Sequence, residues 1–315
     1  MEKTMTETKE YKKINFKKIE KTDRGVYEAL LFADGEMGCE FSFGNLYLWG
    51  RQKMAVVEGC AVMFSQFDRK TVYPFPVGPG DKKAAVDAII EDAAARGISC
   101  RITGLSCENR SLLDSLYPGR FRFHCDEGNH DYVYAIDDLA DLKGRKFHSK
   151  KNHVNRFAES FPDCRAEPLT EENIASVRAM IEKWYADKTE ENPESDFMME
   201  RAAIEKALNS FGEIGMEVLV LMNGEEALAV TFGSRLSCDT FDVHFEKAAS
   251  GVQGAYAAIN REFAVYIREK YQDVKFLNRE EDMGIEGLRK AKLSYHPHHR
   301  VAKCWAHLME EGYEY

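Results

Sequence analysis

Apolar residues recur along the chain at two spacings, and these spacings follow the same order in each half. Alternation over a few residues predicts strands, and apolar positions three or four residues apart predict helices. In the first half, three strands and a long helix are expected at 54–57, 60–64, 71–75 and 82–96. In the second half, the equivalent elements are expected at 217–222, 227–234, 240–245 and 253–270, with Asn-Gly as the hairpin turn.

Further elements flank these two series in a matching order. A strand and two helices come before each series, and a strand, a short helix and two strands come after it. The order repeats at ~145 residues, the spacing of two ordinary domains in tandem. We therefore predict an α+β fold of two domains, each with a mixed, mostly antiparallel sheet flanked by helices. The first domain is expected at 12–140, a basic linker helix at 141–162 and the second domain at 163–310.

The composition is that of a folded globular protein with an acidic surface. The chain has 315 residues, of which 44% are hydrophobic, and this is ample for proper cores. Its net charge of −10 argues against binding nucleic acid or anionic membranes through the whole surface. No sequence-specific DNA binding is therefore expected, and an anionic partner requires a local basic patch.

The cysteines and the N-terminal residues predict a cytoplasmic protein. The 8 cysteines include no Cys-x-x-Cys pair, so we expect reduced thiols. The first twenty residues are polar and charged, which excludes an apolar secretory signal among them. No later window approaches ~18 consecutive apolar residues, so no transmembrane helix is expected.

Charged residues directly follow an apolar strand near the C-terminus. After the run 274–277 come Asn278, Arg279, Glu280, Glu281 and Asp282. Asp282 is expected at or near the N-cap of a short helix that begins after Gly284. Polar residues at a strand end beside a helix N-terminus often carry the chemistry of α/β proteins, so the three acids are candidate catalytic residues. The alternative is that Asp282 only caps the helix and the glutamates form a solvated loop.

Two further candidate catalytic residues lie on the strand expected at 240–245. Asp242 and His244 alternate with apolar residues and therefore project from one face. Beside the charged run they could line a cleft for an amine nucleophile, with a carboxylate or His244 as general base. A half-exposed edge strand is the alternative. No metal site is expected, because proline interrupts the histidines at 296–299 and they have no identifiable partner ligand.

Basic residues gather between the two expected domains. The segment from 143 to 158 contains six cations and no acid in a chain that is acidic overall. A basic helix face at a domain junction suits a phosphorylated ligand. The residues expected to bind such an anion are Lys146, Lys150, Lys151, Arg289 and Lys292. The alternative is a solvated linker helix paired with the acidic surface.

The C-terminal motif resembles a known family. A strand-end Asn-Arg-x-x-Asp-x-Gly, a helix with Leu-Arg-x-x-Lys and a Ser-Tyr-His-Pro run are similar to the domain named after the C-terminal catalytic part of phosphatidylglycerol lysyltransferase. The residues concerned are Asn278, Arg279, Asp282, Gly284, Leu288, Arg289, Lys292, Ser294, Tyr295, His296 and Pro297. The family has tandem acetyltransferase-like (GNAT) folds. The resemblance covers about 16–308 and implies two such domains, of which we expect the second to carry the site and the first to be mainly structural.

The resemblance also implies a donor site. The segment 250–256 resembles the GNAT pyrophosphate loop, in which backbone N–H groups at a helix N-terminus hold an anion. The residues expected to bind the donor are Gln253, Gly254, Tyr256, Asn278 and Arg279. A plain helix-starting turn is the alternative. A Gly254→Asp substitution is expected to abolish ligand binding and to leave the fold intact.

Two functions are consistent with these features. Members of the family resemble both GNAT enzymes and the Fem-type peptidoglycan aminoacyltransferases, which take their aminoacyl group from charged tRNA. The first expectation is therefore transfer of an acyl or aminoacyl group to an amine or hydroxyl acceptor. No cofactor is expected to be tightly bound, and acetyl-CoA, another acyl-CoA or aminoacyl-tRNA would be the donor substrate. The alternative is a non-catalytic GNAT-fold module that binds a phosphorylated or anionic ligand.

Overall fold

Each half of the chain forms three antiparallel strands, then a helix, then a strand parallel to the third. The computed structural model describes residues 11–35, 37–67, 70–194 and 197–309. In the first half these elements are β2 (Gln52–Val57), β3 (Cys60–Phe67), β4 (Lys70–Pro74), α3 (Lys82–Arg96) and β5 (Arg101–Leu105). In the second half they are β9 (Met216–Asn223), β10 (Glu226–Arg235), β11 (Thr240–Ala248), α9 (Ala255–Lys270) and β12 (Phe276–Asn278). The pairs β4/β5 and β11/β12 are parallel, and the helix between the two strands of each pair supplies the crossover connection that parallel strands need.

The flanking elements confirm the repeated order. Those of the first half are β1 (Lys17–Lys18), α1 (Arg24–Leu31), α2 (Phe43–Trp49), α4 (Cys107–Leu116), β6 (Phe121–Cys125) and β7 (Asp131–Ala135). The connection between the halves contains α5 (Ile136–Asp141) and α6 (His148–Ser160). Those of the second half are β8 (Arg165–Pro168), α7 (Ile174–Glu191), α8 (Met198–Leu208), α10 (Glu286–Leu293), β13 (His299–Val301) and β14 (Cys304–Leu308). Short 3-10 helices are η1 (Lys21–Asp23), η2 (Cys39–Phe41), η3 (Glu127–Asn129) and η4 (Arg145–Phe147).

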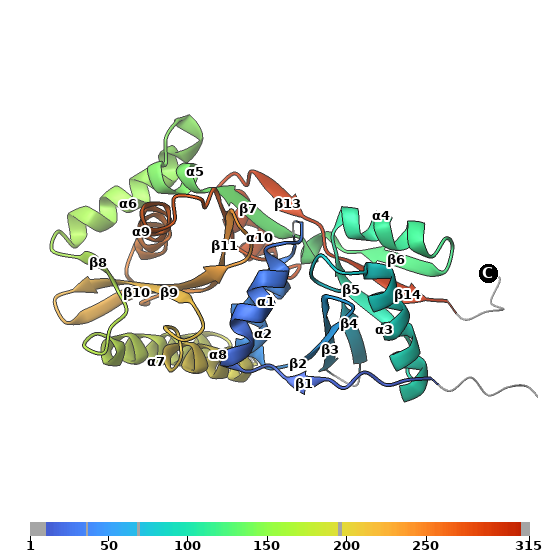
Figure 1. Ribbon diagram of the computed structural model, residues 1–315. Coiled ribbons are helices and arrows are strands. Elements are labelled where there is room, and N and C mark those ends of the chain that lie inside the picture. Colours follow the sequence, from blue (N-terminus) through green and yellow to red (C-terminus); the bar gives the residue numbers. More distant parts are fainter. Residues whose placement is uncertain (1–10, 36, 68–69, 195–196, 310–315) are drawn as a thin grey trace, which may run out of the picture.

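The last strand of each half is exchanged between the two sheets (Figure 1). Within the described residues, the strand orders are β1-β2-β3-β4-β5-β14-β6 and β13-β7-β12-β11-β10-β9-β8. The C-terminal β14 therefore lies between β5 and β6 of the first sheet, and β7 lies between β12 and β13 of the second. The expected boundaries at 140 and 163 separate the sheets except for these two strands, which tie the halves together.

The second sheet is buried on both faces. Along β9, Leu219 and Leu221 pack with the buried side chains of α5, α6 and α9. Val218 and Val220 alternate with them and pack with those of α7 and α8. In Figure 1, α6 and α9 lie on one side of this sheet and α7 and α8 on the other. Because full burial of a Val or Leu side chain stabilises by about 1.5–3 kcal/mol, such apolar runs hold the sheet in place.

Local sequence signals set several helix ends. The Asp81 side chain accepts a hydrogen bond of 2.9 Å from the backbone N–H of Ala84 and so caps α3. Gly97 ends this helix in the left-handed conformation, with φ of 67°. Ser42 caps α2 by accepting from the backbone N–H of Asn45 at 3.3 Å. Across the part of the chain that the structure describes, no helix is long and apolar enough to cross a membrane.

The structure also corrects details of the sequence predictions. Helix α7 extends to Glu191, and Tyr295 lies in a turn that follows α10. The first ten residues of the polar N-terminal segment lie outside the described residues. Cys125 and Cys304 form a disulfide between β6 and β14, so the expectation of reduced thiols is wrong for this pair.

Candidate functional site

A cavity of about 570 Å³ lies where β11, α9, α10 and the loop after β12 meet. Strand β12 ends at Asn278, opposite Asp242 of β11, so the chain that follows turns over His244 and Glu246. Residues named from the sequence that line the cavity are Lys150, His244, Tyr256, Arg279, Glu280, Glu281 and Lys292. Leu288 and Tyr295 of the C-terminal motif also line it, and the other lining residues are Glu200, Val243, Phe245, Glu246, Lys247, Met283 and Ala291.

Buried cations form much of the cavity wall. Arg279 Nη2 lies 3.0 Å from Glu246 Oε1, and Lys247 Nζ lies 2.7 Å from a Glu200 carboxylate oxygen. Burial lowers the pKa of the Lys247 ammonium and that of Lys150. The cavity wall therefore carries four cations alongside the carboxylates of Glu200, Glu246, Glu280 and Glu281, and two of these cations, Lys150 and Lys247, are poorly hydrated.

Tyr295 and the chain after β12 hold two more of these cations. Lys150 Nζ lies 3.9 Å from the centre of the Tyr295 ring, and the Arg279 guanidinium lies 5.0 Å from it. Lys292 Nζ donates to the backbone carbonyls of Arg279 and Glu280, the latter at 3.0 Å. Burial lowers the pKa of Lys292. Its ammonium thus fixes the loop that carries the two candidate glutamates.

His244 lies between two carboxylates at the base of the cavity. Its Nδ1 is 3.4 Å from Asp242 Oδ2 and 3.6 Å from Glu280 Oε1, and its Nε2 is 2.8 Å from Ser234 Oγ. Asn45 Nδ2 donates to Glu280 Oε1 at 2.9 Å and to Asp242 Oδ2 at 3.3 Å. Burial and the neighbouring Glu280 carboxylate raise the pKa of Asp242 well above its ordinary value. The structure thus brings together three residues that the sequence proposes for catalysis.

Strand β11 is an inner strand, so the alternative of a half-exposed edge strand is wrong. It pairs with β10 on one side and β12 on the other. Helix α2 packs so closely against the polar residues of β10 and β11 that a side chain has no room at position 44. A Cβ at Gly44 would lie 2.6 Å from His244 Nε2 and 2.7 Å from Ser234 Oγ. The glycine therefore lets the helix cover this group.

A second buried cluster surrounds the ammonium group of Lys303. Its Nζ lies 2.7 Å from Asp131 Oδ1, 2.7 Å from Glu281 Oε2 and 3.4 Å from Glu40 Oε2. Although burial opposes it, the negative groups around Lys303 raise its pKa well above the ordinary value. Burial raises the pKa of Glu40 to about 7. Lys303 thereby holds the Glu281 carboxylate at the cavity wall.

Asp282 is not the N-cap of α10, which begins at Glu286 with Ile285 as its N-cap. The buried Asp282 carboxylate accepts hydrogen bonds from Arg289 Nε at 2.9 Å and from the Tyr132 hydroxyl at 2.6 Å. The bond from Arg289, more than any other contact, holds the pKa of Asp282 well below its ordinary value. Asp282 and Arg289 therefore bind each other, and neither lines the cavity.

The segment 250–256, expected to bind the donor, instead packs at the contact between α9 and α6. Gly254 has φ of 84°, and a Cβ there would lie 2.4 Å from the His153 carbonyl oxygen, so the glycine allows α9 to approach α6. The expectation that Gly254→Asp spares the fold is therefore wrong. Gln253 is exposed and does not line the cavity, whereas Tyr256 does. Asn278 is buried and accepts from the backbone N–H of Glu280 at 2.8 Å, which shapes the turn after β12.

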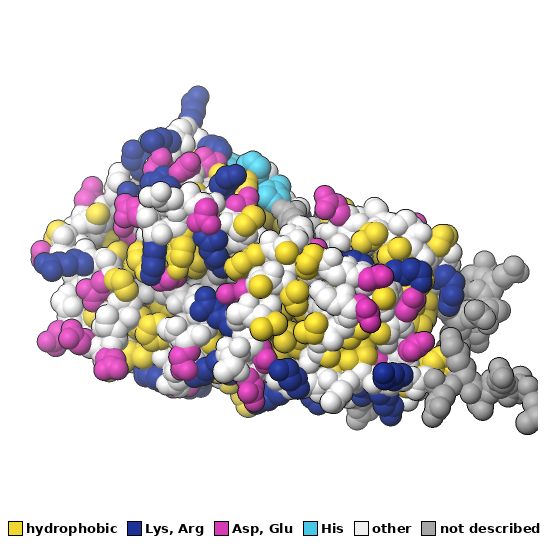
Figure 2. All heavy atoms as spheres, viewed as in Figure 1, with side chains coloured by type: hydrophobic (Ala, Val, Ile, Leu, Met, Phe, Trp, Pro, Cys, Tyr) yellow, Lys and Arg dark blue, Asp and Glu magenta, His cyan; other side chains and the backbone are white. Residues whose placement is uncertain are grey.

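The basic linker helix contributes one cation to the cavity. Lys150 lines it, whereas Lys146 Nζ lies 2.9 Å from Asp138 Oδ2 and Lys151 is exposed. Figure 2 shows Lys and Arg side chains over α5 and α6 mixed with acidic ones. The outer face of this segment therefore resembles an ordinary charged surface.

Several residues of the site were not found from the sequence. They include Asn45, Ser234, Glu246, Lys247 and Lys303. Tyr295 belongs to the Ser-Tyr-His-Pro motif, which offered a signal. Glu246 continues the alternation of Asp242 and His244 along β11, so the spacing of that strand could have found it. Asn45, Ser234 and Lys303 have no such signal, because each reaches the site from another part of the chain.

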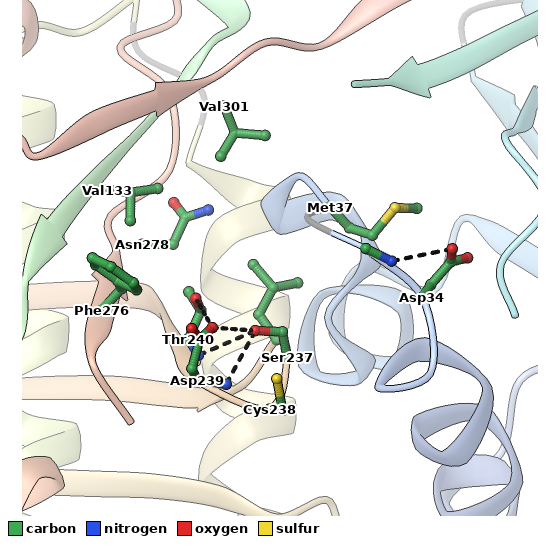
Figure 3. A pocket seen from close by; sticks show the side chains of 12 residues that line it. Asp34, Met37, Val133, Ser237, Cys238, Asp239, Thr240, Phe276, Asn278 and Val301 are labelled. Atoms are coloured by element: carbon green, nitrogen blue, oxygen red, sulfur yellow. Dashed lines mark hydrogen bonds between the residues drawn. The ribbon is translucent and has the colours of Figure 1, made fainter. Parts of the chain in front are cut away.

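A second, smaller cavity of about 290 Å³ lies beside Asn278 (Figure 3). The loop after α1 and the turn between β10 and β11 form two of its sides. In that turn the Asp239 carboxylate accepts from Ser237 Oγ and Thr240 Oγ1, both at 3.1 Å. Because these polar groups satisfy one another, the first cavity is the better candidate for chemistry.

The sequence of the chain matches a protein family and a curated relative. Residues 35–307 match the family described as phosphatidylglycerol lysyltransferase, C-terminal. An uncharacterized protein of Mycoplasmoides gallisepticum is 21% identical over 173 residues, and the match spans about half, 54%, of each chain.

Solved structures share the fold over most of the chain. A conserved protein of unknown function from Bacteroides thetaiotaomicron is 37% identical, with TM-score 0.89 over 94% of this chain and 100% of that one. The C-terminal domain (DUF2156) of an Agrobacterium fabrum protein assigned as a lysylphosphatidylglycerol synthetase is 13% identical, with TM-score 0.69 over 92% and 93%. FemX is 10% identical, with TM-score 0.61 over 94% and 98%.

These likenesses agree with the architecture described above. The two sheets flanked by helices fit two tandem GNAT-like domains, which confirms the expected fold class. The family match extends over both sheets, from before β2 to within β14. The chain therefore belongs to the phosphatidylglycerol lysyltransferase C-terminal family.

Proposed function

We propose that this protein transfers an acyl or aminoacyl group from an activated donor to an amine or hydroxyl acceptor in the larger cavity. One observation carries the proposal: a single cavity combines buried cations with the His244 and Glu280 side chains, whose Nδ1 and Oε1 atoms are 3.6 Å apart. The family is named after a lysyltransferase, and FemX shares the fold. Both likenesses support aminoacyl transfer.

The cations favour a donor that carries phosphate groups. Aminoacyl-tRNA and acyl-CoA both carry phosphate groups, which lie one ribose away from the ester in aminoacyl-tRNA and beyond the pantetheine arm in acyl-CoA. Among the described residues, no carboxylate oxygen lies within 4.0 Å of Lys150 Nζ, so this ammonium is available to a ligand. Arg279 can contribute a planar guanidinium beside it, although Glu246 already holds one nitrogen. We expect aminoacyl-tRNA to be the preferred donor because of the family likeness.

The proposed reaction is direct attack of the acceptor on the donor carbonyl. A new C–N or C–O bond forms, and the ester bond to tRNA or the thioester bond to CoA breaks. The acceptor proton passes to the group formed by Asp242, His244 and Glu280, and the leaving oxygen or sulfur takes up a proton. Of the described residues that line the cavity, none is Ser, Thr or Cys, which favours transfer without a covalent enzyme intermediate. Orientation of the two substrates would supply much of the rate.

Adjacent lysines provide a matched test of the donor site. Lys150→Gln removes a cavity cation, and Lys151→Gln removes an exposed one with the same charge change. We expect Lys150→Gln to weaken binding of aminoacyl-tRNA or acyl-CoA and to reduce the slope of log affinity against log salt by about 1. Binding is measured by fluorescence titration at several salt concentrations. Equal effects of the two substitutions would contradict the proposed donor site.

Transfer itself is tested with defined donors. The protein is incubated with aminoacyl-tRNAs or acyl-CoAs and a set of amine and hydroxyl acceptors, and products are identified by mass spectrometry. We expect one donor class to be consumed with formation of an amide or ester. Tight donor binding without any product would favour the alternative, a binding module that keeps the fold and the anion site.

A further inference from the structure

Two groups of side chains could each bind a metal ion, and only one of the groups has a lysine from the described residues beside its carboxylates. In the first, formed by Cys39, Glu40 and Asp131, the Lys303 ammonium already supplies a positive charge, 2.7 Å from Asp131. In the second, formed by Asp242, His244 and Glu280, no Lys or Arg nitrogen of the described chain lies within 4.0 Å of either carboxylate. In the first group a lysine thus balances the negative charge of the carboxylates, and the part of the chain that the structure describes provides no such cation to the second group.

The second group also contains buried polar atoms without partners. His244 Nδ1 and Asp242 Oδ1 have no hydrogen-bond partner among the described residues, and neither side chain has any exposed surface. A buried unsatisfied polar atom destabilises the fold by ~1–3 kcal/mol. The unpartnered Nδ1 of His244 lies 3.4 Å from the other oxygen of Asp242, Oδ2, and a species bound between the imidazole and the carboxylates would complete its interactions.

The distances match a tetrahedral ion. Ligand atoms ~2.0–2.2 Å from a tetrahedral zinc ion are ~3.3–3.6 Å apart. His244 Nδ1 lies 3.4 Å from Asp242 Oδ2 and 3.6 Å from Glu280 Oε1. We propose that Asp242, His244 and Glu280 bind a divalent transition-metal ion, with zinc as the best fit to one imidazole and two carboxylates.

Neighbouring residues form hydrogen bonds that orient the side chains of the proposed ligands. Ser234 Oγ lies 2.8 Å from His244 Nε2 and can accept its proton, which leaves the lone pair of Nδ1 directed at the carboxylates. Asn45 donates to both carboxylates and sets their angle. The His244 and Asp242 side chains are fully buried, whereas the Glu280 side chain is partly exposed and lines the cavity, so the fourth position of the ion would open on the Glu280 side. An acceptor amine or hydroxyl bound there would lose its proton more easily, to the Glu280 carboxylate oxygen that does not bind the ion.

This site escapes sequence analysis, which predicts no metal. Its ligands come from two positions of β11 and from the loop after β12, a spacing that matches no short metal motif. The parallel pairing of β11 with β12 brings them together. The proposal rests on this geometry and does not depend on the transfer reaction.

The test is metal binding by the chelator-treated protein. A Cys107→Ser, Cys238→Ser background removes the exposed thiols, which could bind zinc on their own. We expect one zinc per chain by isothermal titration and elemental analysis, and an intense visible absorption typical of tetrahedral cobalt when Co²⁺ replaces it. We also expect a higher melting temperature with zinc. None of these readouts requires enzymatic activity.

Substitutions assign the ion to these side chains. His244→Ala and Glu280→Gln are expected to weaken zinc binding by more than ~100-fold, and Ser234→Ala by ~10–100-fold through loss of orientation. Glu281→Gln, the adjacent cavity glutamate that pairs with Lys303, is the matched control and should bind zinc as the parent does. Because Glu280 is partly exposed, its variant is expected to fold, which circular dichroism checks. Less than stoichiometric binding by the parent, or equal binding by Glu280→Gln and Glu281→Gln, would overturn the proposal.

Discussion

Glu280 and Glu281 are neighbours in the chain, but their carboxylates belong to different networks. Glu280 accepts from Asn45 at 2.9 Å and faces His244, whereas Glu281 pairs with Lys303 at 2.7 Å. The backbone at Glu280 has φ of 57°, a left-handed conformation that turns the two side chains apart. Chemistry is therefore expected from the first glutamate and structural support from the second.

Substitution by glutamine separates these two roles. We expect Glu280→Gln to lower kcat by ~10²–10⁴-fold, because the group that takes up the acceptor proton loses a carboxylate. Glu281→Gln is expected to change kcat little but to reduce the free energy of unfolding by ~1–3 kcal/mol, since Lys303 loses a charged partner. Turnover and urea unfolding of both variants provide the check. A larger rate loss in Glu281→Gln would reverse the assignment.

Asp282 offers a prediction about acid stability. Its buried carboxylate accepts from Tyr132 and Arg289, so Asp282→Asn should reduce the free energy of unfolding by ~1–3 kcal/mol at pH 7. The pKa of Asp282 is depressed in the fold, chiefly by the hydrogen bond from Arg289. The charged form therefore stabilises the fold above its unfolded pKa of ~3.9, and this contribution is lost as the pH falls toward the folded pKa.

The pH dependence supplies the measurement for Asp282. Urea unfolding of the wild type and of Asp282→Asn is compared between pH 7 and pH 2.5. We expect the difference in unfolding free energy to be constant near neutrality and to shrink below pH ~4. A difference that stays constant through the acid range would show that the carboxylate charge does not stabilise the fold.

At the scale of elements, the site depends on how closely α2 covers β11. Gly44 lies in the first turns of α2, directly over His244 and Ser234. Helix α1 also carries a glycine, Gly25, but an added Cβ there would meet nothing within 4 Å. The two glycines therefore have different reasons to be present, although both lie in helices of the first half.

Alanine substitutions distinguish the two helices. Gly44→Ala places a methyl group against His244 Nε2, and we expect it to lower the free energy of unfolding by ~1–3 kcal/mol and to reduce zinc binding. Gly25→Ala should stabilise by ~0.5–1 kcal/mol, because alanine favours the helix and no contact opposes it. Thermal and urea unfolding measure both effects. If Gly44→Ala is as well tolerated as Gly25→Ala, the close packing of α2 is not required.

At the scale of the whole molecule, the exchanged strands make the two halves interdependent. Each sheet contains one inner strand from the other half, β14 in the first and β7 in the second. The disulfide between Cys125 and Cys304 joins β14 to β6 across 179 residues of sequence. Lys303, which directly precedes β14, holds Asp131 at the start of β7. Strand exchange and the Lys303 cluster thus lie in the same region.

Separation of the halves tests this interdependence. Fragments 11–162 and 163–309 each lack an inner strand, so exposed strand edges remain where β14 and β7 belong. We expect neither fragment to show a cooperative thermal transition alone, and we expect their co-expression to restore one. Circular dichroism and calorimetry check this result. A cooperative transition of the isolated second fragment would show that its sheet is stable without β7.

The local spacing of apolar and polar residues was enough to predict the secondary structure and to locate the candidate site residues. The two periodicities predicted the order of helices and strands, because each depends only on neighbours in the chain. The charged run after residue 277 and the pair Asp242 and His244 were located in the same way. The family resemblance added the GNAT-like character of both domains, which the structure and its relatives confirm.

Tertiary structure decided which of these residues act together. Asp282 meets Tyr132 across 150 residues of sequence, and Glu280 meets Asn45 across 235. These contacts form because the two sheets exchange strands and because α2 packs over β11. Neither feature produces a periodic pattern in the sequence. Burial then sets the charges, since removal from water raises the pKa of Asp242 and lowers that of Lys150. Sequence therefore located the candidate groups, and only the packed fold assigned their partners, because distance and desolvation are properties of three dimensions.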